Sequence, residues 1–157
     1  MRRPSFADKQ GRTAAVKILL VEDSRSIRME NDRALSHAGY EVISSQDGEE
    51  ALQYARKEHP DLILLDLLLP KMPGVEVLAR LKSDAETSGI PVVVVSGLSE
   101  KNREKLLAAG AEDYLEKGSL MPDKGINLLP KVLTDVVCRI NRRRGIAFSQ
   151  SPTSSGR

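Results

Sequence analysis

Short apolar runs alternate with amphipathic segments along most of the chain. Five runs are rich in Val, Ile and Leu, which is typical of strands that are covered on both faces of a parallel sheet. After each run, apolar residues recur at helical spacing until a Gly, a Pro or a polar stretch. The predicted strands are residues 16–21, 40–44, 61–66, 90–96 and 113–116, and the predicted helices are residues 24–37, 49–57, 75–83, 99–109 and 128–141.

This alternation predicts the fold class. Five strands and five helices in turn form βαβ units, which build an α/β fold with a doubly wound, five-stranded parallel sheet of the flavodoxin-like kind. Residues 1–15 show no sustained period, and we expect them to be disordered. Residues 142–157 are basic and then rich in Ser, and we expect a disordered tail there. We therefore predict a single domain at residues 16–141, between these two segments.

Composition excludes several kinds of site. The chain has 157 residues, of which 40% are apolar and 29% charged, as in ordinary globular proteins. One Cys and two His exclude a disulfide framework and a metal centre rich in Cys or His. No apolar run approaches the roughly 20 residues that span a bilayer, and no signal peptide is visible. We therefore expect a cytoplasmic protein without a membrane partner.

The net charge of +2 is the sum of unlike regions. Residues 1–15 hold four basic residues and one acidic residue, and residues 139–157 hold five Arg and no acid. Residues 16–138 hold 15 basic and 21 acidic residues, so the body is acidic. The basic run 142–144 has no aromatic residues interleaved with it, and a nucleic acid is therefore not an expected partner.

Polar side chains follow the predicted strands at their carboxyl ends, where open α/β sheets bind ligands. Glu22 and Asp23 follow the first strand, and Asp66 ends the third. Ser96 ends the fourth strand, and Lys117 follows the fifth. Three carboxylates beside one lysine repel one another unless a cation joins them. Oxygen ligands of this charge suit Mg²⁺, which accepts few carboxylates and keeps several waters.

The same groups suit phosphoryl transfer. An ionised carboxylate can attack a phosphoryl group as a nucleophile, and the phosphoryl group adds about two negative charges. Mg²⁺ and Lys117 can neutralise its oxygens, while the hydroxyl of Ser96 can donate a hydrogen bond to one of them.

Residues 16–141 resemble the receiver domain of bacterial two-component response regulators, such as the chemotaxis regulators. The motifs that carry the resemblance occur in the family's order and at its spacing. They are Leu20-Val21-Glu22-Asp23-Ser24, Asp61-Leu62-Ile63-Leu64-Leu65-Asp66, Leu69-Pro70-Lys71-Met72-Pro73-Gly74, Val94-Val95-Ser96-Gly97 and Tyr114-Leu115-Glu116-Lys117.

The resemblance implies a role for each site residue. Asp66 would accept a phosphoryl group from a histidine kinase or a phosphotransfer protein. Asp23 and Asp66 would bind Mg²⁺ directly, Glu22 would act through water, and the backbone carbonyl of Leu68 would be a further ligand. Lys117 would pair with the phosphoryl oxygens.

The resemblance also implies a switch. The hydroxyl of Ser96 would move to the phosphoryl group and the ring of Tyr114 would turn inward. These movements would shift the face formed by the fourth helix, fifth strand and fifth helix, where a downstream target protein would bind. Such a change is a population shift between two packings. It describes a signalling protein whose chemistry is limited to its own phosphorylation and dephosphorylation.

Three positions depart from the family's pattern. Gly118 stands where the family usually has a Pro, often cis, and the extended stretch 118–127 separates it from the last helix. Pro73 stands where the family usually has Asp. Leu68 replaces a polar residue that helps to set autodephosphorylation, so we expect its apolar side chain to shield the phosphoryl group and lengthen its lifetime.

Two other functions stay open beside a stand-alone response regulator. A receiver-like module could bind partners without phosphorylation. An aspartyl-nucleophile phosphohydrolase would need a second Asp two residues after the nucleophile as general acid, where this chain has Leu68. Too few residues follow residue 141 for an output domain, which would need roughly 60. We therefore expect signalling by protein–protein contact.

Overall fold

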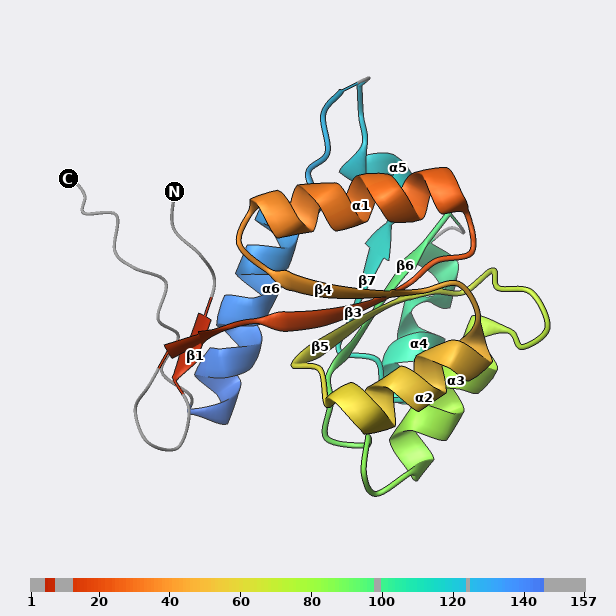
Figure 1. Cartoon of the computed structure of the whole chain (residues 1–157). Coiled ribbons are helices and arrows are strands. Elements are labelled where there is room, and N and C mark those ends of the chain that lie inside the picture. The colour runs from red at the N-terminus through yellow and green to blue at the C-terminus, as the bar shows by residue number, and fades with distance from the viewer. Residues whose placement is uncertain (1–4, 8–12, 98–99, 124, 146–157) are drawn as a thin grey trace.

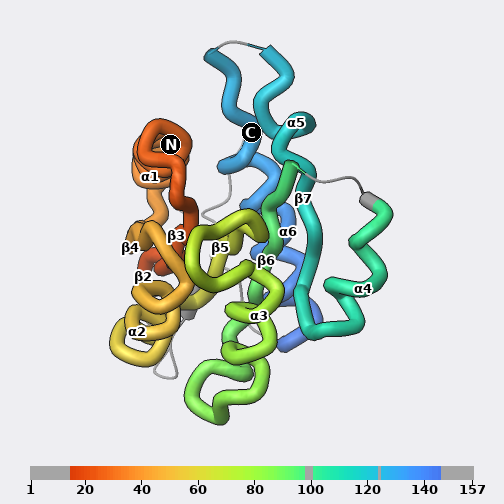
Figure 2. The backbone as a smooth tube through the Cα atoms, turned by 90° about the vertical axis from the view of Figure 1, so that its right-hand side faces the viewer, coloured from red at the N-terminus to blue at the C-terminus, as the bar shows by residue number. Residues whose placement is uncertain are grey.

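A five-stranded parallel sheet forms the centre of the fold. The computed structural model describes residues 5–7, 13–97, 100–123 and 125–145. The strand order is β4-β3-β5-β6-β7, which Figure 2 shows from left to right, and helices cover the sheet (Figure 1). The predicted α/β fold class is thereby confirmed. The strands are β3 (Lys17–Val21), β4 (Glu41–Ser45), β5 (Leu62–Asp66), β6 (Val92–Ser96) and β7 (Asp113–Glu116).

The helices follow these strands along the chain and pack on both faces of the sheet. Among the described residues, none of them is long and apolar enough to cross a bilayer. They are α1 (Arg25–His37), α2 (Gly48–Glu58), α3 (Gly74–Ser83), the 3₁₀ turn η1 (Glu100–Asn102), α4 (Arg103–Ala108), α5 (Lys117–Leu120) and α6 (Leu129–Arg144).

Two apolar clusters, one on each face of the sheet, explain the continuous apolar runs. Because side chains alternate along a strand, Leu19 and Leu65 pack with α2 and α3, while Ile18 and Leu64 pack toward α1 and α6. Each central strand is therefore buried on both faces, as parallel sheets require. The fully buried large residues include Ile18, Leu19, Leu35, Leu62, Ile63, Leu64, Leu65, Leu78, Leu81, Leu129 and Leu133.

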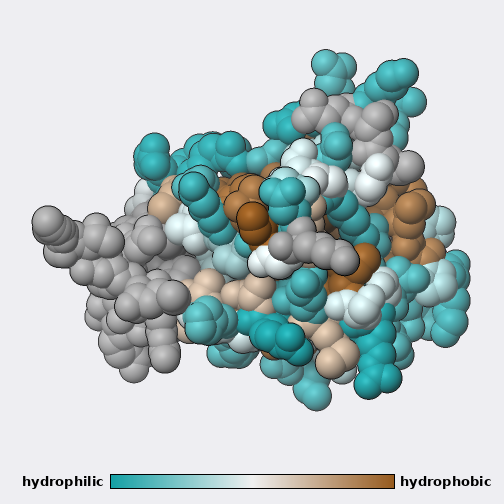
Figure 3. Space-filling view, turned by 90° about the horizontal axis from the view of Figure 1, so that it is seen from above, coloured by the Kyte–Doolittle hydropathy of each residue, from teal (hydrophilic) through white to brown (hydrophobic). Residues whose placement is uncertain are grey.

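The outer surface over α1 is mostly polar. Seen from above, hydrophilic residues dominate it, and apolar residues show as separate patches (Figure 3). The exposed large apolar residues include Met29 on α1, together with Met121 and Ile126 in the segment after α5. Single apolar residues of this kind are ordinary on a protein surface.

A close approach at Gly74 shapes the loop that follows β5. A Cβ at this position would lie 2.5 Å from the carbonyl oxygen of Asp66 and 2.5 Å from the Cα of Leu67. The Gly74 amide donates to the carbonyl of Leu67 over 2.9 Å. Only glycine lets the start of α3 pack this closely against the end of β5, and this contact fixes the backbone beside Asp66.

The N-terminal segment corrects one expectation. Within residues 1–15, which we expected to be disordered, β1 (Ser5–Ala7) and β2 (Thr13–Ala15) pair antiparallel at the amino end of β3. Three-residue strands have too few positions to show a period, and their pairing uses backbone groups that every sequence carries.

The last three helices, α4, α5 and α6, also differ from the prediction. The last helix was predicted to end at residue 141, but α6 continues through Arg144 and ends at Gly145, whose φ of 69° is left-handed. Residues 146–157 of the predicted disordered tail lie outside the described residues. The predicted helix start at Ser99 also lies outside them, and η1 precedes α4. The single turn α5 was not predicted, because four residues are too few to show a helical period.

Candidate functional site

Three carboxylates meet where β3 and β5 end, at the right-hand edge of the sheet in Figure 1. Glu22 and Asp23 follow β3 directly, and Asp66 is the last residue of the neighbouring β5. One oxygen from each lies within 4.8 Å of the others. Glu22 is only 3% exposed and Asp66 only 4%, whereas Asp23 faces solvent. The site is therefore a small acidic pocket with one open side.

Lys117 brings the positive charge to this pocket. It follows β7 directly and is the first residue of α5, and its peptide bond to Gly118 is trans. Its Nζ donates to Glu22 Oε1 over 2.8 Å and to Asp66 Oδ2 over 3.0 Å. Burial opposes the ammonium charge, but the hydrogen bonds and charges of the two carboxylates outweigh it and raise the pKa of Lys117. The side chain therefore stays protonated at neutral pH.

The surroundings of Glu22 disfavour the charged form of its carboxyl group. Burial raises the pKa of Glu22 above its ordinary value of 4.5, and the nearby charge of Asp66 acts in the same direction. Hydrogen bonds from Lys117 and from the Ser24 amide oppose this change without cancelling it. The carboxylate pocket therefore holds more negative charge than its one lysine balances, which favours the entry of a cation.

This excess charge predicts a pH effect on stability. Because the folded state raises the pKa of Glu22, folded protein binds that proton more tightly than unfolded protein, and stability falls as pH rises above about 4.5. We expect the unfolding free energy of Glu22→Gln to rise relative to that of the wild type between pH 4.5 and 7 without metal. Urea unfolding at both pH values measures this difference. Glu30→Gln, on the exposed side of α1, is the control; an equal change in both variants would contradict the explanation.

Ser96 lies on β6, the strand next to Asp66, and Tyr114 lies on β7, one strand further along the sheet. Val95 pairs with Asp66, so Ser96 lies one residue beyond it at the end of β6. Tyr114 pairs with Val94 and packs in the same apolar cluster. Strand alternation therefore places Ser96 and Tyr114 toward the same face of the sheet. Both residues are buried, and the ring of Tyr114 already lies inward.

Leu68 lies in the loop that follows β5. Its amide donates to Asp66 Oδ1 over 3.1 Å, whereas Lys117 donates to Oδ2, so the two donors together fix the carboxylate. The side chain of Leu68 is 61% exposed. The structure therefore brings Glu22, Asp23, Asp66 and Lys117 together, and places the backbone of Leu68 beside them.

The contacts of two further groups of residues near the site were not predicted from the sequence. Arg28, near the start of α1, donates from Nη1 to the backbone carbonyls of Glu22 and Asp23. Side chains of an α-helix lean toward its N-terminus, so an arginine five residues after Asp23 could have been expected to reach back to this loop.

The second group surrounds Asp113, the first residue of β7. This carboxylate is buried and accepts hydrogen bonds from Arg103 of α4 and Arg139 of α6. Arg103 also donates to the carbonyl of Tyr114 over 3.3 Å. The network therefore ties α4, β7 and α6 together, but the arginines look like ordinary surface charges in the sequence.

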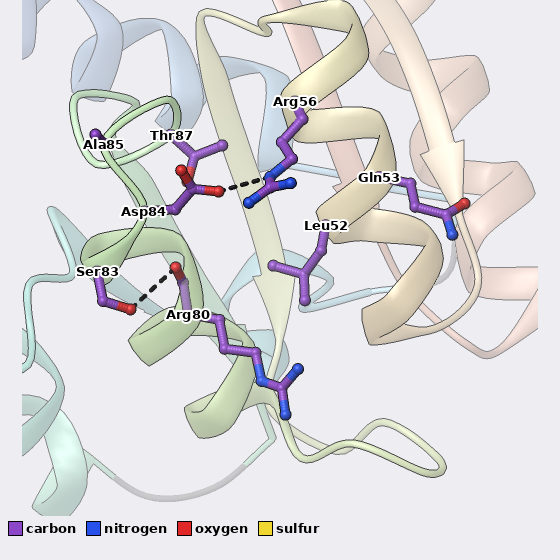
Figure 4. A pocket seen from close by; sticks show the side chains of 8 residues that line it. All are labelled: Leu52, Gln53, Arg56, Arg80, Ser83, Asp84, Ala85 and Thr87. Atoms are coloured by element: carbon purple, nitrogen blue, oxygen red, sulfur yellow. Dashed lines mark hydrogen bonds and ion pairs between the residues drawn. The ribbon is translucent and has the colours of Figure 1, made fainter.

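A larger groove lies elsewhere, between α2 and α3 (Figure 4). It encloses about 650 Å³ and is lined by Leu52, Arg56, Arg80 and Asp84, among others. Its charges are already paired: Arg56 Nε lies 2.6 Å from Asp84 Oδ2, and Arg80 is paired with a glutamate on its own helix. This groove lacks the converging carboxylates found at the sheet edge. We therefore assign the functional site to the acidic pocket of Glu22, Asp23 and Asp66.

Comparison with known proteins agrees with this geometry. A model of the response regulator receiver domain matches residues 18–125. The polar-differentiation response regulator DivK of Brucella ovis is 41% identical over 107 residues, which cover 67% of this chain and 86% of that protein. The probable transcriptional regulator ycf27 of Porphyridium aerugineum is 41% identical over 102 residues, or 64% of this chain. The match spans only 41% of that relative's length.

Solved structures show the same likeness. The chemotaxis response regulator CheY4 of Vibrio cholerae superimposes with a TM-score of 0.67 at 30% identity, covering 81% of this chain and 99% of that one. The BeF3-activated N-terminal receiver domain of Klebsiella pneumoniae RstA gives a TM-score of 0.64 at 28% identity, covering 80% of this chain and 96% of that one.

Proposed function

Because the chain belongs to the response regulator receiver domain family, we propose that Asp66 accepts a phosphoryl group from a histidine kinase or a phosphotransfer protein. Receiver domains are signalling modules of two-component systems. The observation that carries the proposal is the buried carboxylate of Asp66, held by Lys117 at 3.0 Å beside two further acids. We take residues 16–141 as the functional unit and the cytoplasm as its location.

The proposed reaction is a displacement at phosphorus. An oxygen of Asp66 forms a bond to phosphorus, and the bond between phosphorus and the donor's imidazole nitrogen breaks, with the electron pair leaving on that nitrogen. Lys117 donates to one oxygen of Asp66 and the Leu68 amide donates to the other, so both donors orient the carboxylate for the attack. Lys117 stabilises the negative charge on the transferred oxygens.

The residues present fit Mg²⁺. The side-chain donors of Glu22, Asp23 and Asp66 are carboxylate oxygens, and their charge exceeds that of Lys117. Asp23 and Asp66 would bind the ion directly, Glu22 would bind through water, and the Leu68 carbonyl would be a further ligand. Bound there, Mg²⁺ supplies positive charge for the phosphoryl oxygens.

The proposed output is a change of the face formed by α4, β7 and α6. Ser96 is the hydroxyl that responds to the phosphoryl group, and Tyr114 is the aromatic residue that follows it. The hydrogen bonds of Asp113 to both flanking helices support this assignment, because they let a shift of β7 reach α4 and α6 together. A downstream target protein would bind this face.

Incubation with acetyl phosphate and Mg²⁺, followed by intact-mass measurement, tests the proposed function. The addition of one phosphoryl group supports it. An unchanged mass would overturn it in favour of a module that binds without phosphorylation. Continuous hydrolysis of a phosphomonoester would favour a phosphohydrolase instead.

The exposed side chain of Leu68 predicts a long-lived phosphoryl group. An apolar group at this position can neither orient nor deprotonate an attacking water, whereas an amide can orient one. We expect Leu68→Asn to shorten the lifetime of the phosphorylated protein about fivefold, well below the effect of a full general base. The loss of added mass with time in Mg²⁺ measures it. Leu107→Asn changes an exposed leucine on α4 and is the matched control. Equal lifetimes of the Leu68 variant and the wild type would contradict the proposed role of Leu68.

A further inference from the structure

The loop between β3 and α1 is held by an arginine. Arg28 Nη1 donates to the carbonyl of Glu22 over 2.8 Å and to the carbonyl of Asp23 over 3.2 Å. The same loop is held by the Glu22 amide, which donates to Ser45 of β4, and by the Ser24 amide, which donates to Glu22 Oε2. Both acids that follow β3 therefore have their backbone fixed by the same guanidinium.

The position of this charge is unusual for a helix. Arg28 lies in the second turn of α1, and its side chain reaches back over the N-terminus, where the helix dipole disfavours a cation. The first turn of α1 has no acidic residue to compensate. The carboxylates of Glu22, Asp23 and Asp66 compensate for this unfavourable position of the Arg28 charge, because Lys117 balances only one of their three charges.

We propose that Arg28 is a positioning residue of the acidic pocket. It holds the backbone of Glu22 and Asp23 so that their carboxylates face Asp66 despite mutual repulsion, and it acts through these two residues without touching the phosphoryl group. The proposal rests on the proposed function, because the positioned groups are those that would hold Mg²⁺. It predicts that Arg28 sets the affinity for the ion.

The experiment is calorimetric titration of the full chain with Mg²⁺ at pH 7, for the wild type, Arg28→Gln, Arg28→Lys and Arg33→Gln. Groups that orient metal ligands typically change affinity 10–100-fold when replaced, so we expect Arg28→Gln to raise the Kd for Mg²⁺ about tenfold. Arg28→Lys keeps the charge and several donors, and its Kd should stay within about threefold of the wild type. Arg33→Gln removes the same charge from an exposed position of the same helix and should leave the Kd unchanged.

Thermal unfolding without Mg²⁺ separates positioning from a general structural role. If Arg28→Gln unfolds at a lower temperature but binds Mg²⁺ like Arg33→Gln, the proposal is overturned. If wild-type protein binds no Mg²⁺, both this proposal and the metal site fail. If wild-type protein binds Mg²⁺ but gains no mass from acetyl phosphate, only the proposed function fails, and the Kd of the Arg28 variants still decides this inference.

Discussion

Replacement of Asp66 by Asn is expected to abolish phosphorylation by acetyl phosphate, with a rate at least about 100-fold below that of the wild type. The amide keeps the shape of the carboxylate, but its one oxygen can take the place of only one of the two carboxylate oxygens that accept from Lys117 and from the Leu68 amide. It lacks the negative charge and the nucleophilic oxygen that form the bond to phosphorus. Intact-mass measurement over time in acetyl phosphate and Mg²⁺ gives both rates.

The matched control is Asp123→Asn, which makes the same change at an exposed site after α5. It should be phosphorylated like the wild type. Phosphorylation of Asp66→Asn at the wild-type rate would place the acceptor elsewhere and refute the assignment. The variant should also unfold at a higher temperature without metal, because one charge of the repelling cluster is gone.

Lys117→Met should have the second largest effect, on both activity and stability. Loss of one donor to a developing negative charge typically lowers a rate 100–1,000-fold, and we expect phosphorylation to slow by about 100-fold. Without metal at pH 7, the variant should lose about 3 kcal/mol of unfolding free energy, because Glu22 and Asp66 stay buried without a cation. Lys117 is 28% exposed, which keeps the loss at the lower end of the range for buried pairs.

The pH dependence of this loss follows from the pKa values. The pKa of Lys117 is raised in the folded protein, so its contribution persists through neutral pH and is lost only above its ordinary value of 10.5. On the acid side, the deficit of the variant should shrink as Glu22 takes up its proton. Urea unfolding at pH 4.5, 7 and 9 checks the profile. Lys131→Met, an exposed lysine on α6, is the control, and equal losses in the two variants would contradict the ion-pair explanation.

The central sheet could be predicted from the sequence because its strands are buried on both faces. This burial leaves continuous apolar runs such as Leu62–Asp66, whose final carboxylate marks the strand end. The acids and Lys117 could be placed together because parallel strands bring their carboxyl ends to one edge. The order of the motifs then connected them with a known family.

What the sequence did not reveal depends on contacts between distant parts of the chain. The apolar stripe of the last helix ends at Ile140, and only the left-handed Gly145 shows where the helix stops. Arg28 resembles any charged residue on a helix surface until its contacts with the loop are known. The same holds for Asp113, whose partners come from helices on either side of it in the chain.

The placement of Lys117 has a consequence for folding during synthesis. This lysine lies 95 residues after Glu22 and 51 after Asp66, and it follows β7, the strand at one edge of the sheet. Contacts of such high sequence separation form late, because a long loop must close first. A nascent chain that has not yet added β7 therefore carries its acids without their cation, and phosphoacceptor competence should arise only when the last strand joins the sheet.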